Sequence, residues 1–257
     1  MDIQDKVAVV TGASSGLGRR LAVDLAAAGA RVIAVARREE RLRELVQEMG
    51  RSSPHSGYRT CDLKDVSAFT GLLGEIEADC GRIDILLNVA GVGGIDRRGE
   101  PTVDTLRWVM EVNFFAPYAG LLAVLPGMRR RRSGVVANMS SDDARSPGPG
   151  VGDYAASKAA LSAATESLAY TVRRDGVSLH VIYPAWVPTE MGLAAVHSGG
   201  MPMPPRLARR SEEQVSRLVL RRLGGPRIEI NAAALPMIAP VFRSVAPVAY
   251  QRMRGQR

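Results

Sequence analysis

The sequence predicts an α/β fold, in which one parallel β-sheet carries helices on both faces. Two observations support this prediction. Short apolar runs rich in β-branched residues alternate with longer segments of helical periodicity, which is typical of repeated strand–helix–strand units. A glycine-rich segment, TGASSGLG at residues 11–18, connects the first apolar run to the first helical segment. Because no repeat or linker divides the 257 residues, we expect a single doubly wound domain with a sheet of about seven strands.

The expected elements follow in chain order. A first strand is predicted at Lys6–Val10, and a helix at Gly16–Ala28 ends before Gly29, a residue type that commonly terminates helices. Apolar runs predict further strands at Arg31–Ala36, Ile83–Asn88, Gly134–Ser140, Ser178–Tyr183 and Arg227–Asn231. Helical periodicity predicts long helices at Val103–Arg131 and Tyr154–Arg174.

We expect residues 1–231 to form this domain, with a lid at about residues 186–210, and residues 232–257 to form a separate tail. The tail is apolar and basic, and Pro236, Pro240 and Pro247 interrupt it, so it is not expected to span a bilayer. Prolines spoil the long amphipathic helix that a membrane surface would bind. The favoured interpretation is therefore packing within a homodimer or homotetramer, and peripheral contact with an acidic membrane surface is the alternative.

Composition argues against several classes of protein. The net charge is +8, but the charge is scattered, and its densest run, Arg129–Arg132, has the position of a helix C-terminus. Nucleic-acid binding is therefore not expected. Cys61 and Cys80 are the only cysteines and the histidines do not cluster, so no metal site is expected. The N-terminus lacks the pattern of a signal peptide and no run of 18 apolar residues occurs, which favours a cytoplasmic location.

The glycine-rich segment predicts a dinucleotide site. Gly12, Gly16 and Gly18 allow a tight turn and let the backbone approach a pyrophosphate at the N-terminus of the next helix. An NAD site usually has an acidic residue about 20 positions later, which binds the ribose 2′-hydroxyl. Arg37 and Arg38 stand in that region here. An arginine pairs with a phosphate and a carboxylate repels it, so NADP(H) is predicted in preference to NAD(H).

Tyr154 and Lys158 predict the chemistry. They are four residues apart in a helical segment, so both side chains lie on one face of the helix. A free phenol has a pKa near 10, and a nearby ammonium lowers that pKa by stabilising the phenolate. Tyr154 could then give a proton to a carbonyl oxygen as hydride arrives, or take one from an alcohol in the reverse direction.

In the order and spacing of their motifs, residues 1–190 resemble the short-chain dehydrogenase/reductase family, whose fold is of the Rossmann type. The motifs are TGASSGLG, CDL with Asp62, NVAG at residues 88–91, Asn113 in MEVNFFAP, Ser141 thirteen residues before Tyr154, and PAWVPTE at residues 184–190. The resemblance implies a cofactor site formed by Gly12, Ser14, Ser15, Gly16, Leu17, Gly18, Arg37, Arg38, Asp62, Leu63, Asn88, Ala90, Gly91, Tyr154, Lys158, Pro184, Val187 and Thr189.

The resemblance also implies a catalytic set of Asn113, Ser141, Tyr154 and Lys158. In the family's chemistry, Ser141 would bind the substrate oxygen and Tyr154 would exchange the proton. Lys158 would bind the nicotinamide ribose and lower the tyrosine pKa, and Asn113 would hold a water of a proton relay. The predicted function is thus an NADP-dependent dehydrogenase or reductase acting on CH–OH or C=O groups.

The sequence departs from the family's pattern at three places. Val89 replaces an asparagine, Ala185 replaces a glycine, and the proline-interrupted tail replaces the common ending V-D-G-G.

Substrate residues are expected in three loops, Val92–Arg98, Asp142–Asp153 and Trp186–Pro205, of which the last resembles the family's lid. Its methionines favour a hydrophobic alcohol, ketone or acyl-type compound as the substrate. Two alternative functions are a cofactor-binding regulator or scaffold on the same fold, and an epimerase or lyase that retains its cofactor.

Overall fold

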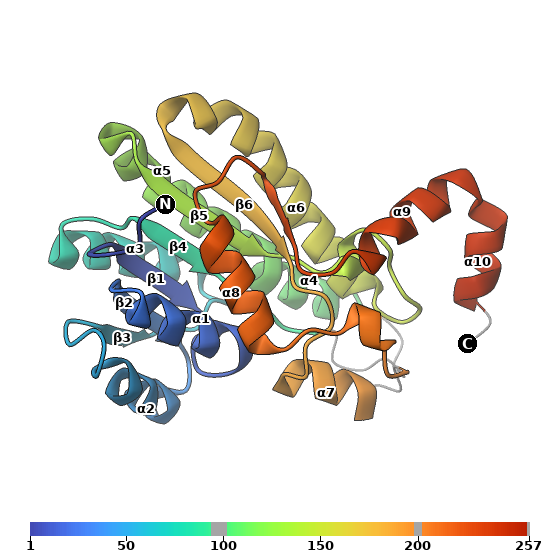
Figure 1. Cartoon of the computed structure of the whole chain (residues 1–257), viewed down its shortest axis with the longest axis horizontal. Coiled ribbons are helices and arrows are strands. Elements are labelled where there is room, and N and C mark those ends of the chain that lie inside the picture. Colours follow the sequence, from blue (N-terminus) through green and yellow to red (C-terminus); the bar gives the residue numbers. More distant parts are fainter. Residues whose placement is uncertain (94–101, 198–201, 256–257) are drawn as a thin grey trace.

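The computed structural model describes residues 1–93, 102–197 and 202–255. These residues contain one parallel sheet of seven strands, in the order β3-β2-β1-β4-β5-β6-β7 (Figure 1). The predicted doubly wound α/β fold is therefore confirmed. The strands in chain order are β1 (Val7–Thr11), β2 (Arg31–Ala36), β3 (Gly57–Thr60), β4 (Ile85–Asn88), β5 (Gly134–Met139), β6 (Val177–Tyr183) and β7 (Glu229–Asn231).

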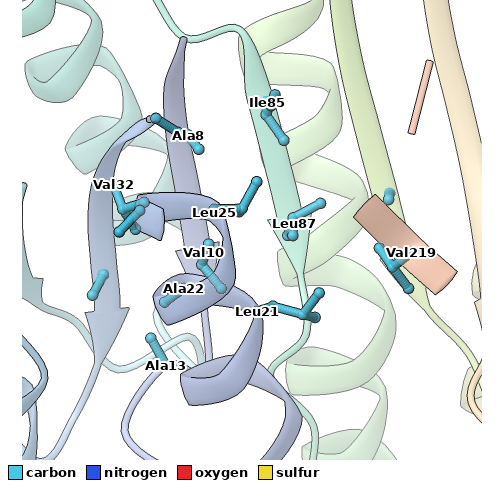
Figure 2. Packing of buried hydrophobic residues seen from close by; sticks show 14 of the residues in the cluster. Ala8, Val10, Ala13, Leu21, Ala22, Leu25, Val32, Ile85, Leu87 and Val219 are labelled. Carbon is cyan, nitrogen blue, oxygen red and sulfur yellow. The ribbon is translucent and has the colours of Figure 1, made fainter. Parts of the chain in front are cut away.

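Helices cover both faces of the sheet. Successive strand side chains point to opposite faces, so Ala8 and Val10 belong to one apolar cluster and Val9 to the other. Figure 2 shows Leu21 and Leu25 of the first helix packed against the strands on one face. That face carries α1 (Gly16–Ala27), α2 (Glu39–Met49) and α8 (Glu212–Arg222), and the opposite face carries α3 (Val66–Cys80), α5 (Ala116–Arg131) and α6 (Gly152–Val172).

The predicted bounds of most strands agree with the structure, and β2 coincides with its predicted range. The strand β3 was not predicted. It is one of the two edge strands of the sheet, and its residues are exposed or only half-buried. An edge strand of this kind needs no continuous apolar run, so its sequence carries little signal.

The predicted helix Val103–Arg131 consists of three consecutive parts, α4 (Val103–Met110), a π-helical segment (Glu111–Phe115) and α5. By length and composition this stretch could cross a membrane, but half of its most apolar window is buried inside the protein. Packing against α3 and α6 accounts for that burial. The buried half of this window is therefore part of the protein core.

The C-terminal tail forms two short helices, α9 (Leu235–Val245) and α10 (Pro247–Gly255). Pro236 and Pro247 lie at helix starts, where the missing N–H group costs little, and only Pro240 lies inside a helix. Figure 1 shows α9 and α10 beyond the edge of the main body, on the side where α4 lies.

Candidate active site

A cavity of about 610 Å³ lies among the segments that follow the strands. The strand order reverses between β1 and β4, and such a reversal is where open α/β sheets bind ligands. Of the residues predicted for the site, all line the cavity except Asn88 and Asn113. Asn88 instead donates from Nδ2 to the Pro117 carbonyl (3.0 Å) and to Asn138 Oδ1 (2.8 Å), so it connects β4 to α5 and β5.

The glycine-rich segment makes a turn that other residues could not adopt. Gly12 has a φ of 69°, and a Cβ there would lie 2.8 Å from the backbone of Ala90. A Cβ on Gly18 would lie 2.3 Å from the carbonyl oxygen of Gly12. Thr11 holds the facing segment, because its Oγ1 accepts hydrogen bonds from the N–H groups of Val89 (3.0 Å) and Ala90 (3.2 Å). The loops after β1 and β4 therefore form one rigid wall.

The N-terminus of α1 faces this cavity with a set of hydrogen-bond donors. Ser15 is the N-cap residue but does not cap α1 with its side chain. Its hydroxyl accepts a hydrogen bond from Arg38 Nη2 (2.7 Å), and Ser14 Oγ accepts from Arg38 Nε (3.2 Å) and Nη2 (3.0 Å). A helix N-terminus, two hydroxyls and a guanidinium form a set that suits phosphate groups. With the close backbone approach at Gly12 and Gly18, these residues fit a dinucleotide.

Asn113 lies behind the cavity wall, in the π-helical segment. Its Nδ2 donates to the carbonyl oxygen of Val92 (2.9 Å) and to Ser157 Oγ (3.1 Å), and its Oδ1 accepts from the Val92 N–H (2.8 Å). A Cβ on Gly91 would lie 3.3 Å from Asn113 Oδ1 and 3.2 Å from Lys158 Nζ. Asn113 therefore fixes the backbone at Gly91 and Val92, which lies between Asn113 and the cavity.

Lys158 brings a buried cation to the site. Its residue is only 3% exposed, and its ammonium donates to the main-chain carbonyl of Met139 (2.8 Å). Burial lowers the pKa of Lys158 to about 8, because the charged form has lost its hydration. The Nζ atom is 6.0 Å from the ring centre of Tyr154. The structure thus places both predicted residues on one face of α6, beside the same cavity.

Ser141 follows β5 and begins a short 3₁₀ turn. Its Oγ accepts a hydrogen bond from the N–H of Asp143 (3.2 Å). Ser141 and Asp143 line the cavity, whereas Asp142 does not and is partly buried. Burial raises the pKa of Asp142 to about 6, although Arg145 opposes this shift. This part of the cavity wall therefore combines the hydroxyl of Ser141 with the carboxylate of Asp143.

Contacts of Arg145 and Ser146 hold the loop between Ser141 and Tyr154. The guanidinium of Arg145 lies 3.3 Å from the ring centre of Tyr183, and its Nη1 donates to Asn231 Oδ1 (2.7 Å). The next residue, Ser146, forms a hydroxyl–hydroxyl hydrogen bond with Tyr250 of α10, and both residues are buried. The C-terminal tail therefore contacts a predicted substrate loop.

A strained residue precedes the segment that was predicted to form a lid. Ala185 has a φ of 64°, in the left-handed region that costs a residue with a Cβ about 1–2 kcal/mol. The departure from the family's glycine is thus accommodated with strain. The following segment is tied down because Trp186 donates from its N–H to the Ala208 carbonyl (3.0 Å) and accepts from the Arg210 N–H (2.9 Å). The helix α7 (Glu190–His197) follows.

Some residues at the site were not predicted from the sequence. Trp108 of α4 lines the cavity, but its helical spacing is equally typical of core packing. Glu190 bridges Arg38 and Arg41, and the hydrogen bonds from both arginines lower the pKa of Glu190. Residues 94–98 of the first predicted substrate loop and residues 198–201 of the predicted lid lie outside the described residues.

Comparison with known proteins identifies the family of the chain. The family model of short chain dehydrogenases matches residues 6–198. A dehydrogenase/reductase SDR family member 7B from Bos taurus is 35% identical, over 99% of this chain and 82% of its own. A fatty acyl-CoA reductase from Acinetobacter baylyi is 35% identical, over 74% of this chain and 65% of its own.

Two solved structures are also similar. A metagenomic short-chain oxidoreductase in complex with NADP has a TM-score of 0.72 and 28% identity, covering 86% of this chain and 91% of its own. A variant of actinorhodin polyketide ketoreductase with NADPH has a TM-score of 0.80 and 27% identity, covering 89% and 96%. The fold and the site define an oxidoreductase that uses a nicotinamide cofactor. The chain belongs to the short-chain dehydrogenase/reductase family.

The buried ammonium generates a prediction about stability. Below pH 8 the charge of Lys158 is retained in both the folded and the unfolded chain, so folding carries the full cost of its burial. Lys158→Met should therefore raise the free energy of unfolding at pH 7 by about 1–3 kcal/mol, since each pKa unit corresponds to about 1.4 kcal/mol. The gain should shrink as pH rises from about 8 towards 10.5, because the folded protein then releases this proton first.

Denaturant unfolding of the cofactor-free protein at several pH values measures this effect. The exposed Lys64 offers a matched control, and Lys64→Met should change the free energy of unfolding by less than about 0.5 kcal/mol. A Lys158→Met variant that is less stable than the wild type at pH 7 would contradict the prediction, because the bond to Met139 would then outweigh the cost of burial.

Proposed function

We propose that this protein is an NADP(H)-dependent oxidoreductase that interconverts an alcohol and a carbonyl group in a hydrophobic substrate, with Tyr154 as the general acid and base. The observation that carries the proposal is the convergence of Ser141, Tyr154 and Lys158 on one cavity, beside a cradle that fits a dinucleotide. When bound, the nicotinamide would supply or accept the hydride.

The chain's own residues would handle the proton and the substrate oxygen. Ser141 would donate a hydrogen bond to that oxygen, and Tyr154 would transfer the proton to or from it. Lys158 places a positive charge near the Tyr154 ring, which favours the phenolate form. Asn113 uses both amide hydrogens on Val92 and Ser157, so any water of a relay would bind at its Oδ1. These groups account for acid–base chemistry in both directions of the reaction.

Tyr154→Phe tests the proposed mechanism. Loss of a general acid lowers the rate by about 10²–10⁴-fold, while cofactor affinity should hardly change because the cradle is intact. The change in NADPH absorbance with a panel of ketones, aldehydes and alcohols measures turnover, and calorimetric titration measures affinity. Tyr170 is an exposed tyrosine on the same helix, bonded to Glu166, and Tyr170→Phe should keep full activity. Undiminished turnover in Tyr154→Phe would remove Tyr154 from the mechanism.

The preference for NADP(H) rests on two arginines. Arg37 and Arg38 follow β2 and line the cavity, and Arg38 also contacts the glycine-rich segment through Ser14 and Ser15. The metagenomic relative contains NADP and the ketoreductase contains NADPH. An arginine pair at this edge suits a 2′-phosphate, whereas a carboxylate there would repel it.

Arg37→Asp should shift the preference from NADP(H) towards NAD(H). A hydrogen bond to a charged group contributes about 1.5–3 kcal/mol, so NADPH should bind about 10- to 100-fold more weakly. Titration of both cofactors measures the shift. Arg59→Asp makes the same change of charge at an exposed arginine that pairs with Asp79, and it should leave both affinities unchanged. If Arg37→Asp weakened the binding of NADH and NADPH equally, Arg37 would not contact the 2′-phosphate.

The walls of the cavity support a hydrophobic substrate. Beside Ser141 and Tyr154, the lining includes the apolar side chains of Trp108, Val112, Val151, Trp186 and Met191. The similar proteins include a fatty acyl-CoA reductase and a polyketide ketoreductase. We therefore favour an acyl-type or comparably apolar carbonyl compound.

We propose that the tail contributes to association as a homodimer or homotetramer. Ile238, Val241 and Val245 on α9 and Val248 on α10 are well exposed, which is unfavourable in water unless another surface covers them. Contact with an acidic membrane surface is the alternative proposal.

Truncation after Asn231 should reduce the oligomeric state, measured by light scattering. Because Tyr250 holds Ser146, truncation should also raise the KM for substrate. The double variant Val241→Ser, Val245→Ser keeps this contact and should affect only association. Liposome sedimentation tests the alternative proposal. Loss of lipid binding in the variants, with an unchanged oligomeric state, would support contact of the tail with a membrane surface. Unchanged oligomer and unchanged lipid binding in both variants would contradict both proposals.

A further inference from the structure

A carboxylate and two arginines meet at the mouth of the cavity. Glu190 is the first residue of α7, while Arg38 and Arg41 lie at the start of α2. Glu190 Oε2 accepts from Arg38 Nη1 (3.1 Å), and its Oε1 accepts from Arg41 Nη1. One guanidinium thus faces each carboxylate oxygen, although α2 and α7 are far apart in the sequence.

The same guanidinium of Arg38 is held from its other side by the cofactor cradle. Its Nε and Nη2 donate to Ser14 Oγ, and Nη2 also donates to Ser15 Oγ. Ser14, Ser15, Arg38 and Glu190 all line the cavity, so the carboxylate occupies the cavity edge next to the N-terminus of α1. The sequence offered no reason to place Arg41 here, since it continues the exposed face of α2.

An anion with more charge and more oxygens would suit this place better than a carboxylate. A phosphate monoester carries about −1.5 to −2 charges and three acceptor oxygens, whereas a carboxylate carries one charge and two oxygens. The side chains of Arg38, Arg41 and Glu190 are about half exposed, at 43%, 44% and 57%. Ion pairs at this exposure contribute little to stability, so a phosphate can displace the carboxylate.

We propose that Arg41 joins Arg38 in binding the 2′-phosphate of NADP(H), and that Glu190 occupies this phosphate site until the cofactor displaces it. The proposal rests on the NADP(H) preference proposed above. It makes Arg41 a specificity-determining residue and Glu190 an internal competitor for the phosphate alone. NAD(H) carries a neutral 2′-hydroxyl in place of the phosphate, so it cannot compete for the two guanidinium groups in this way.

The test compares NADPH and NADH affinities in matched variants. Glu190→Gln removes the competing charge, so NADPH should bind about 3- to 10-fold more tightly, the effect of losing two exposed ion pairs. Arg41→Gln should weaken NADPH binding by about 10-fold. Neither change should alter NADH affinity. Trp108 and Trp186 line the cavity, so energy transfer from tryptophan to the bound reduced cofactor reports binding, with calorimetry as an independent measurement.

Arg43→Gln is the control for Arg41→Gln. Arg43 lies on the same helix and is exposed, but it pairs with Glu39 and Tyr58, so its loss should change neither affinity. The double variant Arg41→Gln, Glu190→Gln should show non-additive effects on NADPH affinity, because the two side chains interact.

The outcomes separate this inference from the proposed function. A wild type that binds NADH at least as tightly as NADPH would overturn the cofactor preference, and the inference with it. If the wild type prefers NADPH but neither Arg41→Gln nor Glu190→Gln changes the affinity for NADPH, the inference alone is overturned. Weaker NADH binding in Glu190→Gln would also overturn it, since Glu190 would then be an acceptor for the ribose hydroxyl.

Discussion

The buried ammonium of Lys158 constrains much of the architecture around it. A charge taken out of water needs compensating dipoles, and here the carbonyl oxygen of Met139, at the end of β5, accepts its hydrogen bond. Gly91, after β4, leaves room for the same ammonium, because a Cβ there would lie 3.2 Å from Lys158 Nζ. The charge can be accommodated only when β4, β5 and α6 pack together as they do in this structure. Since Tyr154 lies one helical turn away, the same packing also positions the phenol.

The parts of this arrangement that depend on local geometry could be predicted from the sequence. Tyr154 and Lys158 share a helix face whatever their surroundings, and the glycines of the first turn impose its conformation. Parallel strands bring their carboxyl ends to one edge, so motifs that follow separate strands converge on one cavity. The α/β class follows from these patterns, whereas the resemblance to the family implied Ser141 and many of the cofactor residues that line the cavity.

Contacts between exposed or irregular segments could not be predicted in this way. Glu190 reaches Arg38 across the cavity mouth, and Tyr250 reaches Ser146 from the tail. Neither pair follows from periodicity or from a motif. The family motif included Asn113, but its contacts with Val92 depend on the π-helical turn, and uniform helical periodicity across Val103–Arg131 conceals that turn. Tertiary packing determines these contacts, and the local sequence pattern does not encode it.

The π-helical turn has a consequence at the level of the gene. A turn closed by i→i+5 hydrogen bonds contains one more residue than an α-helical turn, so Glu111–Phe115 amounts to one inserted residue within a long helix. Each residue of an α-helix advances by about 100°. Loss of one codon here would regularise the helix and rotate either Asn113 or Trp108 away from the active site by that angle. A single in-frame deletion in this stretch should therefore disturb either the contacts of Asn113 or the place of Trp108 in the cavity wall.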